Sequence, residues 1–145
     1  MLKAKKIIAK SPERFAFIMR GVPGSGKSTT AIKLAGSSGI IHAVDNYHVD
    51  SRGSFCWDDA KVEEYYERNF RAFTKSCQRG YPVIVCDCIN IERADFKKYI
   101  DVAKQYGYIT STVVMDPPAP LVAAQRNVHS VTVDQINDMY KKWEH

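Results

Sequence analysis

Residues 21–28 read G-V-P-G-S-G-K-S, a full match to the phosphate-binding loop pattern G-x-x-x-x-G-K-[ST]. Glycines let such a loop fold tightly, so that its backbone N–H groups point at phosphate oxygens. In this pattern Lys27 supplies a mobile positive charge for the β- and γ-phosphates, outside the core, and the Ser28 hydroxyl can hold Mg²⁺. The loop therefore predicts a nucleoside-triphosphate site.

The segments on either side of the loop are those that the pattern requires. Residues 15–19 are an apolar run of strand length, and residues 29–35 indicate a helix that ends near Gly36. The positive end of that helix faces the bound phosphates. The residues predicted to bind the nucleotide are Gly21, Pro23, Gly24, Ser25, Gly26, Lys27, Ser28 and Thr29.

Strand-like and helix-like segments alternate along the rest of the chain. This alternation indicates an α/β fold of the P-loop NTPase class, with right-handed crossovers and a small parallel sheet between helices on both faces. Residues 46–57, here called the acceptor loop, are polar and aromatic and predict a connection. We expect strands over residues 39–44, 82–87 and 108–115, and helices over residues 58–78, 92–106, 121–127 and 133–143.

Two acidic residues follow predicted strands, Asp45 after the second and Asp87 after the third. Ligands of such sheets bind beyond the carboxyl ends of the strands, so both acids are expected near the phosphate-binding loop. Asp87 ends an unbroken apolar run and suits the Mg²⁺ side of a kinase site. Asp45 precedes the acceptor loop and suits the hydroxyl that receives the phosphoryl group. The alternative is that each acid only caps a turn.

Length and charge indicate one domain, residues 15–145, preceded by a basic tail, residues 1–14. Six basic side chains and Glu13 lie in residues 1–20, so the residues before the loop account for the whole formal charge of +5. A basic arm can attract a polyanion such as nucleic acid, or it can only keep the chain soluble; both interpretations stay open. The basic residues are Lys3, Lys5, Lys6, Lys10, Arg14 and Arg20.

Four cysteines without a secretory signal indicate a reducing compartment. We expect a cytoplasmic location and no membrane span; a nuclear or viral intracellular location stays open, and so does a short mitochondrial presequence. The pair Cys86 and Cys88 has no second Cys/His pair at metal-site spacing, so we expect buried thiols there. The oligomeric state is not indicated.

Arg126 lies near the junction of two short predicted helices close to the end of the chain. An arginine on such a mobile segment can close over a nucleotide and neutralise charge on the transferring phosphoryl group. The alternative is a solvated surface arginine. His129 has no partner at metal-ligand spacing, and we expect a surface histidine.

Five motifs occur in the order G-V-P-G-S-G-K-S-T, A-V-D-N-Y, I-V-C-D-C-I-N-I-E-R, A-A-Q-R-N-V-H and I-N-D-M-Y-K-K-W. Together they resemble the kinase domain of polynucleotide 5′-hydroxyl kinases; related small P-loop kinases and the P-loop part of cyclic-nucleotide phosphodiesterases share the set. The resemblance implies a four-stranded parallel sheet and a C-terminal helical lid. It also implies that Lys27 and Ser28 bind ATP and Mg²⁺, that Asp45 is the general base, and that Arg126 contacts the donor phosphates.

The acceptor motif departs from the family pattern. Polynucleotide kinases usually carry D-D-Y-R, whereas residues 45–48 read D-N-Y-H, so His48 stands where an arginine would bind the acceptor phosphate. The main hypothesis is an ATP- and Mg²⁺-dependent kinase that acts on the 5′-hydroxyl of a polynucleotide or nucleotide. Two alternatives are a small-molecule kinase and a nucleotide-binding module without kinase activity.

Overall fold

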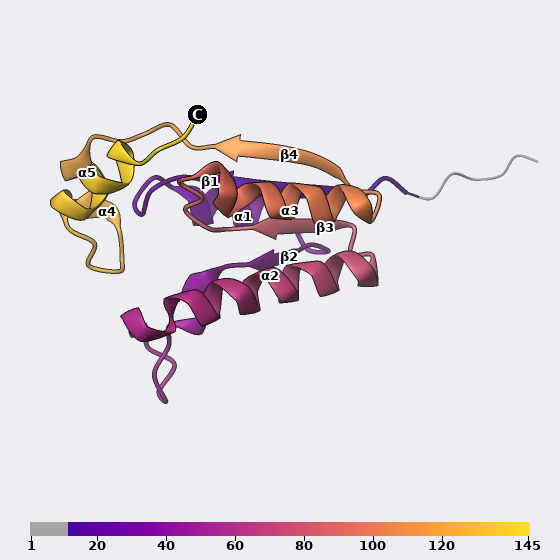
Figure 1. The fold of residues 1–145 in the computed structure, drawn as a ribbon, viewed down its shortest axis with the longest axis horizontal. Coiled ribbons are helices and arrows are strands. Elements are labelled where there is room, and N and C mark those ends of the chain that lie inside the picture. Colours follow the sequence, from indigo (N-terminus) through magenta and orange to yellow (C-terminus); the bar gives the residue numbers. More distant parts are fainter. Residues whose placement is uncertain (1–11) are drawn as a thin grey trace, which may run out of the picture.

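A parallel sheet of four strands forms the centre of the protein (Figure 1). The computed structural model describes residues 12–145, so most of the predicted basic tail lies outside the described residues. The strand order is β2-β3-β1-β4, which places β1 and β3 in the middle. This arrangement confirms the predicted parallel sheet. The strands are β1 (Phe15–Arg20), β2 (Ile40–His42), β3 (Val83–Cys86) and β4 (Ile109–Val114).

Helices cover both faces of the sheet, and two further helices lie at one end of it. Helices α2 and α3 pack on one face and α1 on the other, while α4 and α5 lie beyond the carboxyl ends of the strands (Figure 1). We call residues 120–141 the lid. Within residues 12–145, no helix has the length and apolar character that a membrane crossing requires. The helices are α1 (Lys27–Ala35), α2 (Val62–Arg79), α3 (Arg93–Gln105), α4 (Pro120–Arg126) and α5 (Val133–Lys141).

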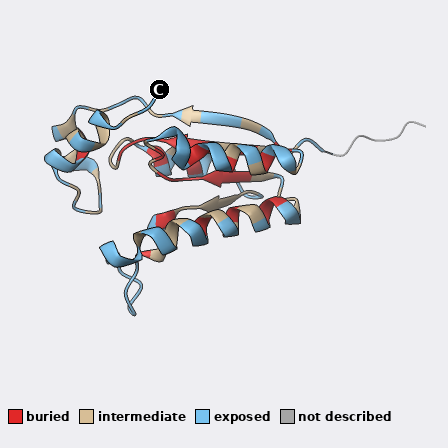
Figure 2. Ribbon diagram, in the orientation of Figure 1, coloured by how far each residue is buried: buried red, intermediate tan, exposed pale blue. Residues whose placement is uncertain are grey.

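The middle strands are buried on both faces, which explains their continuous apolar sequences (Figure 2). Successive side chains of a strand point to opposite faces. Ile18 therefore packs in the core beneath α2 and α3, next to Phe73 and Tyr99. Met19 packs on the other face, against Ala31 of α1. This double burial holds the carboxyl ends of β1 and β3 side by side.

The second strand is shorter than predicted. β2 ends at His42, and the chain then forms a 3-10 turn, Val44–Tyr47, where the prediction extended the strand to residue 44. Val44 is only 5% exposed, so the chain turns to bury this side chain in the core. Asp45 is consequently carried on a turn beyond the sheet edge. Asp58, where the long helix was predicted to begin, instead caps the short 3-10 turn Asp59–Lys61 that precedes α2.

Two arginines that were assigned to a basic arm form contacts within the folded domain. Their assignment to the arm is therefore wrong. Arg14 donates to the Tyr106 carbonyl at 2.7 Å and lies over the Tyr108 ring. Arg20 is only 3% exposed and donates to the carbonyls of Asn90 and Ile91 at 2.8 Å each. Both charges are therefore used within the protein. The four lysines of the arm lie outside the described residues.

Arg20 also holds the C-terminal segment against the end of β1. Its guanidinium donates to the Glu144 carbonyl and lies 4.2 Å from the centre of the Phe96 ring and 4.5 Å from that of Trp143. Hydrogen bonds to a charged group and cation–π contacts are both stronger than their neutral counterparts. The last residues of the chain are thereby fixed beside the phosphate-binding loop.

We expect Arg20→Met to lower the free energy of unfolding by ~3 kcal/mol, because three carbonyl groups lose a charged donor. Urea denaturation measures this change. Arg71→Met, at an exposed position on α2, is the control and should be close to neutral. Equal stability of the two variants would show that Arg20 does not hold the C-terminal segment.

Candidate functional site

The phosphate-binding loop has a conformation that only glycine adopts without strain. Gly24 and Gly26 have φ angles of 83° and 85°, in the left-handed region. A Cβ atom on Gly24 would also lie 2.3 Å from the carbonyl oxygen of Ala123. Helix α4 of the lid therefore packs directly on the loop, and glycine at position 24 is what permits this contact.

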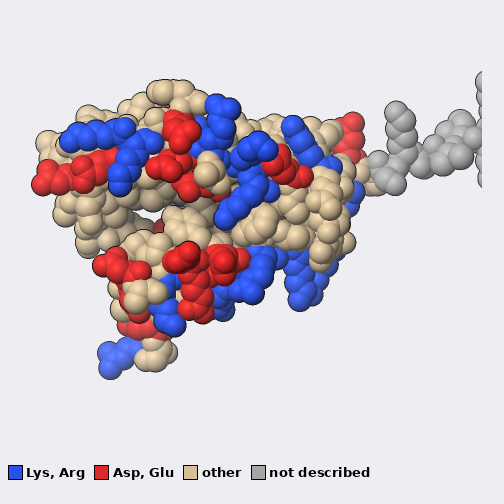
Figure 3. Space-filling view, in the orientation of Figure 1, with Lys and Arg blue, Asp and Glu red and all other residues tan. Residues whose placement is uncertain are grey.

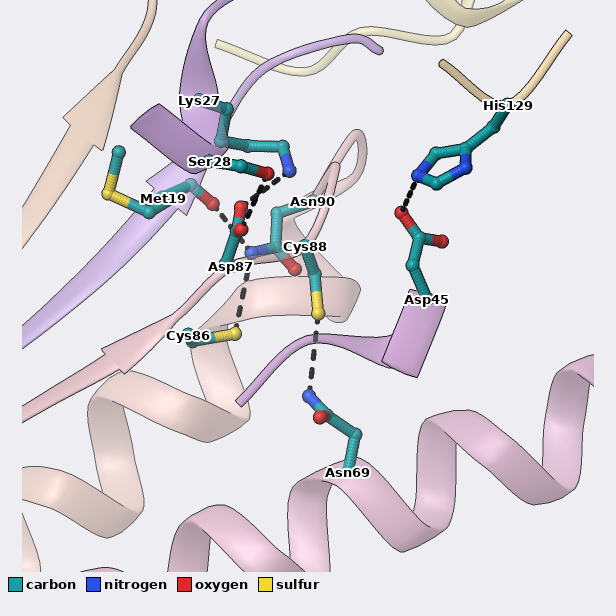
Figure 4. A network of polar contacts seen from close by, with 10 residues as sticks. All are labelled: Met19, Lys27, Ser28, Asp45, Asn69, Cys86, Asp87, Cys88, Asn90 and His129. Carbon is teal, nitrogen blue, oxygen red and sulfur yellow. Dashed lines mark hydrogen bonds and ion pairs between the residues drawn. The ribbon is translucent and has the colours of Figure 1, made fainter. Parts of the chain in front are cut away.

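Asp87 pairs with the two polar side chains that open α1 (Figure 4). The Lys27 Nζ atom lies 2.6 Å from Asp87 Oδ1, and the Ser28 hydroxyl donates to Asp87 Oδ2 at 2.8 Å. β3 pairs with β1 in register, Cys86 opposite Ile18, so the residue after β3 lies next to the loop that follows β1. The structure thus brings Asp87 to the loop.

Lys27 is less free than the sequence pattern suggests. Its side chain is 10% exposed and that of Asp87 is 7% exposed, so the pair is buried. The expectation of a mobile lysine outside the core is therefore wrong. To reach a phosphate, Lys27 must exchange its contact with Asp87 for one with the ligand.

Ser28 and Asp87 offer oxygen ligands of the kind that Mg²⁺ prefers. The Ser28 hydroxyl and the Asp87 carboxylate are within hydrogen-bond distance of each other, at the N-terminus of α1. Mg²⁺ sites in such proteins use one or two protein oxygens together with phosphate oxygens and water. The residues present therefore fit a phosphate-bound Mg²⁺ ion.

Asp45 faces the lid and not the phosphate-binding loop (Figure 4). Its Oδ2 atom lies 3.3 Å from Nε2 of His129, and the Asp45 side chain remains 49% exposed. His129 is 27% exposed, and its ring centre lies 3.9 Å from that of Phe55 in the acceptor loop. His129 is thus a partly exposed histidine that joins the lid to the turn that carries Asp45.

Asn127 shapes the connection between the two lid helices. Its amide nitrogen donates to the carbonyls of Ala123, Ala124 and Val131, at 2.9 to 3.1 Å. Its amide oxygen accepts from the backbone N–H groups of His129 and Val131. The side chain therefore satisfies five backbone groups and orients His129. Asn127 occurs in the motif A-A-Q-R-N-V-H, for which no role of this residue was predicted, although an asparagine between two helices is a common turn signal.

Arg126 is the last residue of α4 and is exposed. It forms no ion pair within residues 12–145, and its helix packs on Gly24 through Ala123. The guanidinium is therefore carried on the helix that touches the loop.

A cavity of about 720 Å³ lies between the acceptor loop and the lid, and we call it the acceptor cavity. Pro23 of the phosphate-binding loop and Asp45 both line it, so donor-side and acceptor-side residues share one space. Figure 3 shows this hollow between the lid and the layer that contains α2. The other lining residues are Phe55, Trp57, Asp59, Val62, Tyr66, Ile89, Ile91, His129, Ser130, Val131, Gln135, Asp138, Met139 and Lys142.

His48 does not take the place of a phosphate-binding arginine. It is 1% exposed, and its Nδ1 atom accepts from the backbone N–H of Asp58 at 3.4 Å. One face of its ring stacks on Trp57, with ring centres 4.2 Å apart. The residue is a packing element of the acceptor loop.

The cysteines that flank Asp87 are buried. Cys86 is 0% exposed and Cys88 is 5% exposed, and their sulfur atoms accept from Asn90 and Asn69. Burial raises the pKa of the Cys86 thiol, so this group stays protonated at neutral pH. Asn90, which sequence reasoning quoted but gave no role, has a φ of 54° and donates to the Met19 carbonyl at 2.7 Å.

Two groups of curated proteins resemble the chain. YLP motif-containing protein 1 from Homo sapiens is 27% identical over 92% of this chain, which spans 7% of that protein. The 2′,3′-cyclic-nucleotide 3′-phosphodiesterase from Rattus norvegicus is 32% identical over 70% of this chain, which corresponds to 23% of the rat protein. The chain thus spans a small part of the relatives it matches.

Solved P-loop kinase structures share the fold. A chain of the Pnkp1/Rnl/Hen1 RNA repair complex matches 92% of this chain and 45% of its own length, with a TM-score of 0.66 and 15% identity. A gluconokinase from Sinorhizobium meliloti 1021 matches 92% of this chain and 76% of its own length, with a TM-score of 0.60 and 19% identity. At these identities the likeness shows the fold alone.

The family assignment covers most of the chain. The family described as "AAA domain" matches residues 17–142, from β1 through the lid. Together with the neighbours above, this match confirms the resemblance to polynucleotide-kinase-like P-loop domains that the motifs indicated. The protein has a P-loop kinase-like, nucleotide-binding fold, and it belongs to the AAA domain family.

Proposed function

We propose that the protein is an ATP- and Mg²⁺-dependent kinase that transfers a phosphoryl group to a hydroxyl, the 5′-hydroxyl of a polynucleotide or nucleotide. The observation that carries the proposal is the acceptor cavity, because Pro23 of the phosphate-binding loop and Asp45 line the same space. A module that only binds nucleotide needs no carboxylate at that position. Similarity to part of a 2′,3′-cyclic-nucleotide 3′-phosphodiesterase supports a nucleotide-type acceptor.

On the donor side, the loop N–H groups and Lys27 bind the phosphates of ATP, and the N-terminus of α1 adds its dipole. Ser28 and Asp87 would hold Mg²⁺, which would supply positive charge to neutralise the phosphates. When Lys27 moves to the phosphates, the Asp87 carboxylate loses its lysine partner and becomes available on the metal side. Arg126 neutralises charge on the transferring group from the lid.

On the acceptor side, Asp45 accepts the proton of the substrate hydroxyl as that oxygen attacks the γ-phosphorus. The bond to the β-phosphate oxygen breaks, and ADP leaves with the electron pair. His129 positions the Asp45 carboxylate through the 3.3 Å contact and thereby couples the closure of the lid to the alignment of the base. Tyr66 also lines the cavity, and burial raises the pKa of its phenol.

Incubation with radiolabelled ATP, Mg²⁺ and a panel of acceptors tests the proposal. The panel contains 5′-hydroxyl DNA, 5′-hydroxyl RNA, nucleosides and gluconate. We expect a 5′-hydroxyl acceptor to become labelled. This labelling should be lost when a chelator removes Mg²⁺. Slow ATP hydrolysis without a labelled acceptor would instead establish the nucleotide-binding module.

A small-molecule kinase is the second candidate. The buried His48 favours it, since the acceptor motif then offers no cation for an acceptor phosphate. If gluconate is the only acceptor in the panel that becomes labelled, the protein is a small-molecule kinase.

Replacing Arg126 by alanine is expected to lower kcat on the order of 10²-fold while leaving the Kd for ATP nearly unchanged, because the charge acts on the transferring group. Steady-state kinetics and calorimetric titration with a non-hydrolysable ATP analogue separate the two effects. The matched control is Gln125→Ala, at the exposed neighbouring position. Unchanged turnover in Arg126→Ala would identify an ordinary surface arginine.

A further inference from the structure

Trp57 is an exposed aromatic side chain at the wall of the acceptor cavity. It is 51% exposed, although an indole is usually mostly buried in a folded domain. It lines the same cavity as Asp45. The protein has only one other tryptophan, Trp143, which lies against Arg20 and lines a separate cavity.

The Trp57 ring is held in a fixed orientation. Its Nε1–H group donates to Asp59 at 2.5 Å. One ring face stacks on the buried His48 imidazole, with an angle of 18° between the planes. His48 in turn packs edge-on against Tyr65, with ring centres 4.7 Å apart. These contacts remove most of the rotational freedom that stacking on a ligand would otherwise cost.

His48 is the one ring that stacks on the indole among residues 12–145, and Trp57 stays half exposed. Trp57 also lines the acceptor cavity, so its side chain is accessible to a second stacking partner there. The volume of about 720 Å³ is within the range of pockets that enclose small ligands. A planar ring on Trp57 would continue the stack that begins with His48.

Charge in the cavity argues against a phosphate as the group that enters it. The ionised side chains of the lining are the carboxylates of Asp45, Asp59 and Asp138 and the ammonium group of Lys142. Acidic side chains also gather on both sides of the hollow in Figure 3. A phosphate would meet an excess of negative charge, whereas an uncharged aromatic ring would not.

We propose that Trp57 is the stacking surface for the nucleobase of the acceptor, so that the cavity takes an uncharged nucleoside, either free or at the 5′ end of a strand. The inference deepens the proposed kinase function, because it names the class of molecule that brings the hydroxyl to Asp45. Aromatic rings hold bases of every type by their π-faces, so selectivity among bases is expected to be low.

Fluorescence titration with adenosine, without ATP, is the first test. We expect adenosine to quench the emission of the wild type and of Trp143→Phe, in which only Trp57 emits. We expect no quenching in Trp57→Phe, in which only Trp143 emits. Quenching that persists in Trp57→Phe and is lost in Trp143→Phe would place the base elsewhere and overturn the proposal.

Calorimetry with Trp57→Ala measures the affinity directly. Loss of the stacking surface should weaken adenosine binding by about tenfold or more, while Trp57→Phe should retain most of the affinity. Uridine should bind with an affinity similar to that of adenosine. A comparison of a 5′-hydroxyl tetranucleotide with the free nucleoside shows whether the strand adds affinity. Wild-type affinity for adenosine in Trp57→Ala, at unchanged stability in urea, would overturn the proposal, as would equal binding of gluconate by the wild type.

Failure of this inference can be told apart from failure of the kinase function. Binding of adenosine at Trp57 without phosphoryl transfer to any acceptor would contradict the kinase and leave the nucleoside site standing. Transfer to a 5′-hydroxyl with the same KM in the wild type and in Trp57→Ala would contradict the stacking surface alone.

Discussion

Asp45→Asn is expected to bind ATP as the wild type does and to lose phosphoryl transfer to every acceptor. Asparagine keeps the size and the hydrogen-bonding groups but cannot accept the proton of the hydroxyl. A positioned general base contributes ~10²–10⁴-fold to the rate. The donor phosphates are bound from the loop side, where Lys27 and Ser28 lie with Asp87. Transfer rates with labelled ATP and calorimetric titration with an ATP analogue measure the two properties.

Asp138→Asn is the matched control for Asp45→Asn, since it removes a carboxylate from the same cavity. A rate within a few-fold of the wild type in this variant would show that the loss in Asp45→Asn is not a general effect of cavity charge. His129→Gln should lower the rate less than Asp45→Asn does, because His129 only positions the carboxylate. If Asp45→Asn transfers the phosphoryl group at the wild-type rate, Asp45 is not the base.

Lys27→Met should lose most of the affinity for ATP and become less stable. Loss of a charge that contacts the transferring phosphates lowers turnover on the order of 10²-fold or more. The lower stability follows from the structure, because Lys27 and Asp87 form a buried pair. Removal of one partner leaves a buried charge without compensation, which typically costs ~3–5 kcal/mol. Calorimetric titration and urea denaturation measure the two effects.

Asp87→Asn and the double variant Lys27→Met/Asp87→Asn separate stability from binding. The double variant should regain much of the lost stability, because no unpaired carboxylate remains, but it should not regain ATP affinity. Asp87→Asn alone should bind ATP in the absence of Mg²⁺ at least as tightly as the wild type, since Lys27 is released. It should also lose the gain in affinity that Mg²⁺ brings. Wild-type affinity for ATP in Lys27→Met would contradict the phosphate-binding role.

Local sequence determined the order of the elements and the donor side of the site. The glycine pattern of residues 21–28 specifies a loop conformation by itself, because the left-handed φ angles of Gly24 and Gly26 are favourable for glycine. Continuous apolar strands require a sheet covered on both faces, and such a sheet brings Asp87 next to Lys27. These features depend on residue type and on short spacings, which the sequence displays directly.

Only the tertiary structure decided the acceptor side. Asp45 meets His129, and His48 stacks on Trp57, because the core draws Val44 inward and the lid folds back over the loop. Arg20 was counted as part of a solvated arm, yet the C-terminal segment buries it. Such contacts join residues far apart along the chain, and no local pattern specifies which partners packing brings together. The sequence therefore predicts the phosphate-binding loop, whereas the acceptor cavity forms only when the chain folds and could not be predicted from local patterns.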